Sequence, residues 1–290
     1  MNTSFILIDG SYYVFYRYYA ILQWWNHQDD NFKKEEHLFN EKFTEMFIKK
    51  IKEIPKKLKI TGNYKVIVAL DCPRCEIWRN TFYDKYKATR QNNNTGVKNS
   101  FKLVMSHNLF KQADVDTILS CRCLEADDCI ALSVKYLQTS FQLTEYKPQI
   151  YIITNDHDYL QLKSENISLI NLQYKIVGEK KTSGDPQKDL FIKSVCGDKS
   201  DNICKIFEFM KIGLKTAPKY FGAEKLTEFT QLCIKEDQKY MDKYGESISI
   251  PTYQKYLNNN RLISFDKIPL EYQDMFIDIN KSKLDDLFTI

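Results

Sequence analysis

The sequence predicts an α/β fold: a mostly parallel central sheet flanked by helices, followed by a helical C-terminal region. Short apolar runs alternate with stretches of helical periodicity, a pattern typical of the strand–helix units that build a parallel sheet. The chain has 290 residues, of which 43% are hydrophobic, so it can bury a substantial core. From Pro186 onward the apolar runs give way to helical segments with basic loops.

Apolar runs mark the predicted strands. YKVIVALD and QIYIIT have the continuous apolar character of buried strands, and the first strand, FILID, ends in an aspartate. The other two runs are shorter or weaker. The predicted strands are residues 5–9, 64–71, 118–121, 149–154 and 167–171.

The segments between the strands carry the helical pattern. Helices are predicted over residues 12–21, 43–58 and 126–137. A further helix is predicted from Pro186, because proline suits the first turn of a helix. Residues 91–99 (QNNNTGVKN) are polar and lack periodicity, which predicts a loop.

We expect an α/β domain over residues 1–184 and a helical region over residues 185–290. No apolar run approaches the roughly 20 residues needed to cross a bilayer. The N-terminal MNTSFILIDGS lacks the basic start and the cleavage site of a secretory signal. An intracellular protein of the cytoplasm or nucleus, without a membrane partner, is therefore expected.

Eight cysteines leave one alternative open, a structural zinc site. Cys72, Cys75, Cys121 and Cys123 could supply four thiolates. However, structural zinc sites usually use two well-formed knuckles, and the second pair here is a CxC inside a predicted strand. Buried or unused thiols are favoured.

Three of the apolar strands run directly into acids. Asp9 and Asp71 end the first two, and Asp156 and Asp158 follow the strand at 149–154. In an open parallel sheet, ligand sites form outside the carboxyl ends of the strands, so the fold brings these acids together. A single aspartate at such a position could instead cap the helix that follows. Three such strand ends in one chain favour a site.

Two further acidic groups lie outside the strands. Glu125, Asp127 and Asp128 open a predicted helix, where the helix dipole favours acids. The dipole does not require three acids in four positions, whose repulsion is unfavourable without a cation. Asp198 and Asp201, three residues apart, would share a helix face.

The mutual repulsion of nine converging carboxylates would be prohibitive unless cations neutralised their charge. Ligands that are all oxygen select hard cations such as Mg²⁺ or Mn²⁺ over zinc. Two such ions about 3.5–4 Å apart can activate water and stabilise both the attacking and the leaving oxygens of a phosphodiester. The acids therefore predict a two-metal hydrolase of nucleic acid.

A basic segment complements the acids. Between Trp78 and Ala113 the chain has seven Lys and Arg residues and one acid, Asp84. Lys87 and Arg90 would project from one helix face, which could hold a scissile phosphate while an aromatic ring stacks on a base. The alternative is a solvated helix face with a few core aromatics.

In order, the stretches IDGSYYVFYRYYA, WRNTFYDKYKATR, LEADDCIAL, ITNDHDYLQL and CGDKSDNI resemble the 5′ nuclease superfamily. This superfamily comprises flap endonucleases, phage 5′→3′ exonucleases and the 5′ nuclease domain of bacterial DNA polymerase I. The resemblance spans roughly residues 5–222. It implies a PIN-like core and a C-terminal helix–hairpin–helix region.

The resemblance also implies roles for individual residues. Two Mg²⁺ ions, replaceable by Mn²⁺, would act with the metal ligand Asp127 as a bridge, while Lys87 and Arg90 contact the scissile phosphate. Arg79 and Tyr86 would support the frayed DNA end, and residues 91–111 would form an arch for a 5′ single strand. The first ion's ligands would be Asp9, Asp71, Glu125, Asp127 and Asp128, and the second ion's Asp156, Asp158, Asp198 and Asp201.

The hairpin departs from the family pattern. In the family, a Gly-rich turn after GDxSDNI binds duplex DNA through backbone amides and a potassium ion. Here CKIFEFMKIGLKTAPKYFG follows, without the preceding glycines and with inserted residues, so the resemblance does not establish a K⁺ site. Lys211, Lys215 and Lys219 could contact phosphate, or simply belong to a basic exposed hairpin.

The predicted function is a metal-dependent, structure-specific 5′ nuclease that cuts DNA near 5′ ends, nicks or 5′-flap junctions in replication, repair or recombination. A monomer is expected, with a separate DNA polymerase as a partner. The high Lys, Asn, Ile and Tyr content is typical of an AT-rich genome, which makes a viral replication site an alternative location. Two alternatives stay open: a PIN-type ribonuclease, and a catalytically silent protein that binds DNA structures.

Overall fold

The computed structural model describes residues 3–29, 35–90, 94–142, 146–178 and 182–288. By its contacts the chain forms two compact units. The first unit comprises Met1–Ile77, Asn92–Val177 and Leu270–Ile290, and the second comprises Trp78–Gln91 and Gly178–Pro269. The domain boundary at residue 184 stays a prediction; these units group residues 78–91 with the C-terminal part and the last helix with the sheet.

The first unit contains a five-stranded sheet in the order β3-β2-β1-β4-β5, and all of its strand pairs are parallel. β1 lies at the centre, where Asp9 aligns with Ala69 of β2 and Ile8 aligns with Ile153 of β4. The predicted α/β fold with a parallel sheet is thus confirmed. The strands are β1 (Thr3–Asp9), β2 (Asn63–Ala69), β3 (Thr117–Leu119), β4 (Ile150–Ile153) and β5 (Ile167–Ile170).

Helices cover this sheet and bury its apolar side chains. Gly10 begins the first helix so close to β2 that an added Cβ would lie 2.7 Å from the Ala69 carbonyl oxygen. Tyr13, Phe43 and Phe47 are fully buried against the strands. The helices of this unit are α1 (Gly10–Asn26), α3 (Glu36–Lys52), α4 (Ile54–Lys57), α6 (Thr95–Ser106), α7 (Leu109–Gln112), α8 (Ala126–Phe141) and α12 (Leu270–Asp285), with 3-10 helices at Arg74–Glu76, His157–Leu162 and Asp286–Phe288.

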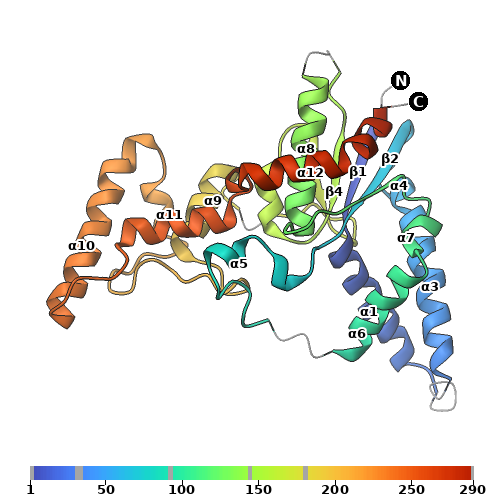
Figure 1. The fold of residues 1–290 in the computed structure, drawn as a ribbon, viewed down its shortest axis with the longest axis horizontal. Coiled ribbons are helices and arrows are strands. Elements are labelled where there is room, and N and C mark those ends of the chain that lie inside the picture. Colours follow the sequence, from blue (N-terminus) through green and yellow to red (C-terminus); the bar gives the residue numbers. More distant parts are fainter. Residues whose placement is uncertain (1–2, 30–34, 91–93, 143–145, 179–181, 289–290) are drawn as a thin grey trace. The chain divides into compact units, whose positions relative to one another are not determined.

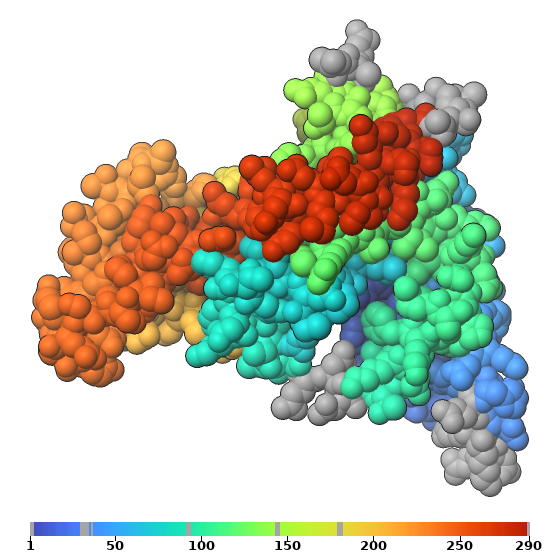
Figure 2. Space-filling model, viewed as in Figure 1, coloured from blue at the N-terminus to red at the C-terminus, as the bar shows by residue number. Residues whose placement is uncertain are grey.

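The last helix, α12, belongs to the sheet-containing unit although it is C-terminal. Asn280 Nδ2 donates to the Ser120 carbonyl at 3.2 Å, and Lys283 Nζ donates to the Ile118 carbonyl at 3.1 Å. Figure 2 shows the red surface of α12 directly beside the green surface of α8. The position of α12 near the end of the chain therefore does not reveal that it packs in the sheet-containing unit.

The loop predicted over residues 91–99 is wrong for its described part. Residues 91–93 lie outside the described residues, but α6 begins at Thr95. Asn94 caps this helix, because its side chain accepts from the Val97 N–H at 3.2 Å. One of the asparagines that suggested a loop is thus a helix cap.

The second unit is helical. Phe191, Phe207 and Phe229 pack in its core with Val195 and Ile206. The segment after Cys196 passes through turns to short 3-10 helices before the next α-helix begins at Leu226. Its elements are α5 (Arg79–Phe82), α9 (Pro186–Cys196), the 3-10 helices Ala217–Tyr220 and Ala223–Lys225, α10 (Leu226–Tyr244), α11 (Thr252–Ile263) and the 3-10 helix Phe265–Lys267. In the described part of the chain, no helix is both long and apolar enough to cross a membrane.

Candidate metal centre and phosphate-binding residues

Asp9 and Asp71 lie at the carboxyl ends of the two central strands. Asp9 ends β1 and caps α1, since its Oδ1 accepts from the Tyr12 N–H at 2.9 Å. Asp71 follows β2, and its Oδ1 accepts from the Ala126 N–H at 2.7 Å. Its other oxygen accepts from the Ser11 hydroxyl. Asp9 and Asp71 therefore each bind the N-terminus of a helix and still lie together at the carboxyl edge of the sheet.

The charges at this edge are strongly coupled. Burial, together with the neighbouring charges of Asp71 and Asp156, raises the pKa of Asp9 to about 7. The Tyr159 hydroxyl donates to Asp9 Oδ2 at 3.1 Å and partly opposes this shift in pKa. Burial and the surrounding acids, including Asp127, raise the pKa of Tyr159 well above its usual value. These acids are thus brought together, as predicted.

Glu125, Asp127 and Asp128 form a compact carboxylate group at the start of α8. One oxygen from each lies within 4.8 Å of the others. Glu125 and Asp128 form a reciprocal capping box, in which Asp128 Oδ2 accepts from the Glu125 N–H at 3.2 Å. Asp128 is fully buried. Oxygen donors this close, beside the coupled Asp9, fit a hard divalent cation.

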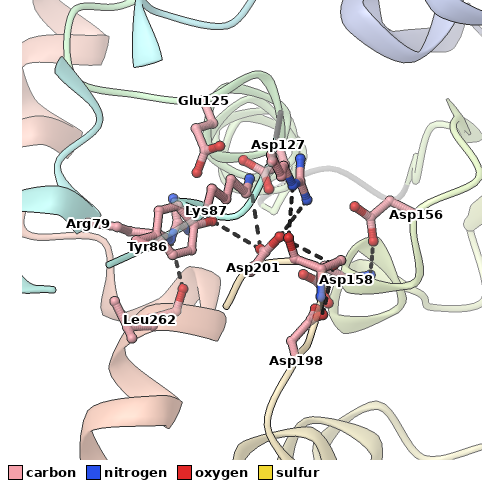
Figure 3. A network of polar contacts seen from close by, with 12 residues as sticks. Arg79, Tyr86, Lys87, Glu125, Asp127, Asp156, Asp158, Asp198, Asp201 and Leu262 are labelled. Carbon is pink, nitrogen blue, oxygen red and sulfur yellow. Dashed lines mark hydrogen bonds and ion pairs between the residues drawn. The ribbon is translucent and has the colours of Figure 1, made fainter. Parts of the chain in front are cut away.

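The pair after β4, Asp156 and Asp158, lies at the start of a 3-10 helix. Asp156 caps it, with its Oδ1 accepting from the Asp158 N–H at 2.9 Å (Figure 3). His157 is exposed in the first turn of that helix. All eight cysteines are free thiols, and the carboxylate group at α8 includes none of them.

In the second unit, basic side chains surround Asp201. Lys87 Nζ lies 3.8 Å from Asp201 Oδ2, the Tyr86 hydroxyl donates to the same oxygen at 3.2 Å, and the Arg90 guanidinium pairs with Oδ1. Figure 3 shows Tyr86 and Lys87 directed at this carboxylate. Lys87 and Asp201 are both buried, at 9% and 7% exposure. These contacts bring together four predicted site residues from two distant segments.

The predicted helix carrying Lys87 and Arg90 is wrong. The helix α5 ends at Phe82, and the chain then turns, with Lys87 in the left-handed region at φ 52°. This conformation is uncommon for a residue with a side chain. The Lys87 N–H donates to the Asp201 carbonyl at 2.9 Å, which fixes the turn through a tertiary contact.

The helix predicted to carry Asp198 and Asp201 is also absent from this described segment. Asp198 pairs with Ile203 in an antiparallel bridge that closes a turn. Lys193 Nζ lies 2.7 Å from Asp198 Oδ2. Burial tends to raise the pKa of Asp198, but Lys193 and the Ser200 donors outweigh it and lower the pKa to about 2.

The other residues predicted to contact DNA differ in burial: two are buried and three are exposed. Arg79 is 2% exposed, and its Nε donates to the Leu262 carbonyl at 2.7 Å, so here it supports the end of α11. Tyr86 is buried beneath the Arg79 and Lys87 cations. Three lysines of the hairpin are exposed: Lys211, Lys215 and Lys219.

Three supporting residues were not predicted from the sequence: Ser11, Tyr159 and Lys193. Each touches a predicted acid through a fold contact, and Ser11 and Asp71 are 60 residues apart. Tyr159 directly follows Asp158, which is the one local signal, although DYL looks like the start of a core segment. The second ligand group implied by the resemblance stays a prediction.

Comparison with known proteins adds a family assignment and a fold match. Residues 4–188 match the family model described as "5'-3' exonuclease, N-terminal resolvase-like domain". A 5'-3' exonuclease of Buchnera aphidicola (subspecies Schizaphis graminum) is 28% identical over 222 residues, 73% of this chain and 67% of that protein. The ribonuclease H of Enterobacteria phage T4 is 26% identical over 252 residues, 82% and 77% of the two chains.

Among solved structures, the bacteriophage T5 flap endonuclease in a complex with DNA and metal ions has a TM-score of 0.65. The match covers 98% of this chain and 99% of that one, at 18% sequence identity. At this identity the likeness shows a shared fold.

Proposed function

The chain belongs to the 5′–3′ exonuclease family with an N-terminal resolvase-like domain, and we propose that it hydrolyses DNA phosphodiesters near 5′ ends or 5′-flap junctions. It is a metal-dependent 5′ nuclease. The observation that carries the substrate proposal is the set of carboxylates at the sheet edge, combined with the buried Lys87 and the exposed Arg90 that pair with Asp201. Cleavage of a phosphodiester develops negative charge on oxygen, which metal ions held by the carboxylates and the side chains of Lys87 and Arg90 would stabilise.

The donor set supports a divalent metal at the sheet edge. Asp9, Asp71 and the group at the start of α8 offer oxygen ligands only. Burial and the charges of Asp71 and Asp156 raise the pKa of Asp9, a cost of ionisation that a bound cation would offset. We propose Mg²⁺ as the ion, with Mn²⁺ as a substitute. Such ions supply positive charge to the attacking and leaving oxygens of the phosphodiester. The proposed ligands are Asp9, Asp71, Glu125, Asp127 and Asp128.

Lys87 and Arg90 are proposed to bind the scissile phosphate. Their present partner, Asp201, holds both cations without substrate and so prepares them for an anion. Burial of Lys87 strengthens its attraction to an incoming phosphate, because less solvent screens the charge. Residues 94–111, which carry α6, are proposed to belong to the arch for a 5′ strand.

Product mapping tests this function. A 5′-labelled flap substrate should be cut near the junction in Mg²⁺ and left intact in EDTA, with blunt, nicked and single-stranded DNA as comparisons. Release of single nucleotides would indicate the exonuclease mode. No cleavage of any of these substrates in Mg²⁺ or Mn²⁺ would refute the proposal and favour a silent DNA-structure binder.

One comparison favours a second substrate. The phage T4 relative carries the name ribonuclease H, so the 5′ strand could be RNA paired to DNA. Matched flaps with a ribonucleotide or a deoxyribonucleotide 5′ strand separate the two. We propose DNA as the preferred strand and replication or repair as the setting.

A further inference from the structure

A buried carboxylate outside the proposed catalytic groups organises the altered hairpin. Glu236 lies on α10 and is 2% exposed. Its Oε1 accepts from the N–H groups of Glu208 and Phe209, at 2.5 and 2.8 Å, and its Oε2 accepts from the Met210 N–H at 2.9 Å. Three consecutive backbone donors thus converge on one side chain.

The residues so held lie in the hairpin segment that departs from the family pattern. On one side, Phe207 is buried in the core against Phe229. On the other, the Phe209 ring packs on Tyr240 and Tyr244 near the end of α10. This segment is therefore held against α10, whose surface is orange in Figure 2, by ring contacts and by the carboxylate.

The basic turn follows directly. The Met210 carbonyl accepts from the Ile212 N–H at 2.8 Å, and the Gly213 carbonyl accepts from the Thr216 and Ala217 N–H groups at 2.9 and 2.8 Å. The Gly213 N–H donates to Thr216 Oγ1 at 2.9 Å. The turn bearing the exposed Lys211 and Lys215 is thus closed on itself and attached to the segment that Glu236 holds.

This donor set does not fit a potassium ion. Potassium needs several oxygen ligands, whereas residues 208–210 direct N–H groups into the turn, where a carboxylate already accepts them. The Met210 and Gly213 carbonyls already accept hydrogen bonds. The negative charge that orders this turn is internal to the chain.

We propose that Glu236 is a positioning residue for duplex DNA, which presents the lysine turn to phosphate without a bound potassium ion. The inference rests on the proposed function. It assigns to α10 a role in substrate binding, separate from cleavage. In Glu236→Ala the turn loses its anchor, so the lysines should bind duplex DNA more weakly while the carboxylates at the sheet edge stay in place.

The test compares Glu236→Ala and Glu236→Gln with Glu228→Gln, which changes an exposed acid on the same helix. The KM for a flap substrate should rise about tenfold in Glu236→Ala, the loss expected when hydrogen bonds to a charged group are removed, with kcat nearly unchanged. Glu236→Gln keeps one accepting oxygen, so its KM should lie between those of wild type and Glu236→Ala. This variant keeps the test decisive if Glu236→Ala does not fold. Hydrogen exchange at residues 208–210 should accelerate in both.

Two further results separate the possible failures. Exchange of K⁺ for Na⁺ at equal ionic strength should leave wild-type binding to duplex DNA unchanged; a clear requirement for K⁺ would overturn the inference. Wild-type cleavage with an unchanged KM in folded Glu236→Ala would overturn it while leaving the proposed function intact. A wild-type chain that cuts no DNA would overturn the proposed function itself.

Discussion

The Tyr159 hydroxyl donates a hydrogen bond to Asp9 Oδ2 at 3.1 Å, joining residues 150 positions apart in the chain. Tyr159 is fully buried at the centre of the acids, so it fixes the orientation of one proposed metal ligand. Partners of metal ligands matter almost as much as the ligands, because they orient the donor oxygens.

We therefore expect Tyr159→Phe to weaken Mn²⁺ binding or activity by roughly 10- to 100-fold, the usual effect of removing such a partner. Calorimetric titration with Mn²⁺ and a flap-cleavage assay measure the two quantities. Tyr146→Phe is the matched control, since the Tyr146 hydroxyl donates to the Thr3 carbonyl, outside the acidic group. Equal behaviour of the two variants would contradict the role assigned to Tyr159.

The raised pKa of Asp9 predicts a pH-dependent stability of the metal-free protein. Because the pKa is about 7 in the folded state and near 3.8 unfolded, the folded state binds more protons between these values. The free energy of unfolding should therefore fall as pH rises from about 4 to about 7.

Asp9→Asn removes this penalty while keeping an oxygen for the Tyr12 N–H. The metal-free variant should be more stable than wild type at pH 8, by on the order of 1–4 kcal/mol, and the difference should shrink toward pH 4. Urea unfolding in EDTA at several pH values measures it. A constant difference across this range would show that Asp9 does not titrate as proposed.

Asp127→Asn should abolish cleavage and leave DNA binding largely intact. The change removes a carboxylate from the group at the start of α8, where the three acids lie within 4.8 Å, but hardly alters shape. Fluorescence anisotropy in Ca²⁺ measures binding, and flap cleavage in Mg²⁺ measures turnover. Asp278→Asn, at an exposed position on α12, serves as the control. Normal turnover by Asp127→Asn would remove the metal mechanism.

Lys87→Ala should lower kcat far more than it weakens affinity for DNA. Lys87 is buried beside Asp201, so we expect its charge to act mainly on the phosphate that reacts. Lys85→Ala removes an exposed lysine two residues away and should leave kcat near its wild-type value. Equal losses of kcat and affinity in Lys87→Ala would indicate a simple anchor for the DNA backbone.

The strands and the acids that follow them could be predicted because their signals are local. The apolar run that ends at Asp9 is a buried strand, and strand ends in a parallel sheet meet at one edge. The convergence of Asp71 and Asp156 on Asp9 follows from that topology. The start of α8 at the acidic group was also visible, since acids favour the first turn of a helix.

The conformations of the turns could not be predicted in this way. Spacing suggested a helix for Lys87 and Arg90, but a backbone hydrogen bond to Asp201 holds Lys87 in the left-handed region. The same three residues meet through a pairing that spans more than 110 positions. Periodicity carries no information about such long-range contacts, which can override local propensity.

Local sequence patterns thus determined the strands of the sheet, the acids at their carboxyl ends and the family resemblance. The apolar pattern of a strand and the capping of a helix both depend on neighbouring residues. The tertiary structure alone decided how the charges are partnered. Tyr159 reaches Asp9, Lys193 reaches Asp198, and Glu236 reaches the backbone of the altered hairpin. Each partner lies on a different element from the group it binds or is separated from it by a turn, so only packing of the folded chain brings the two together.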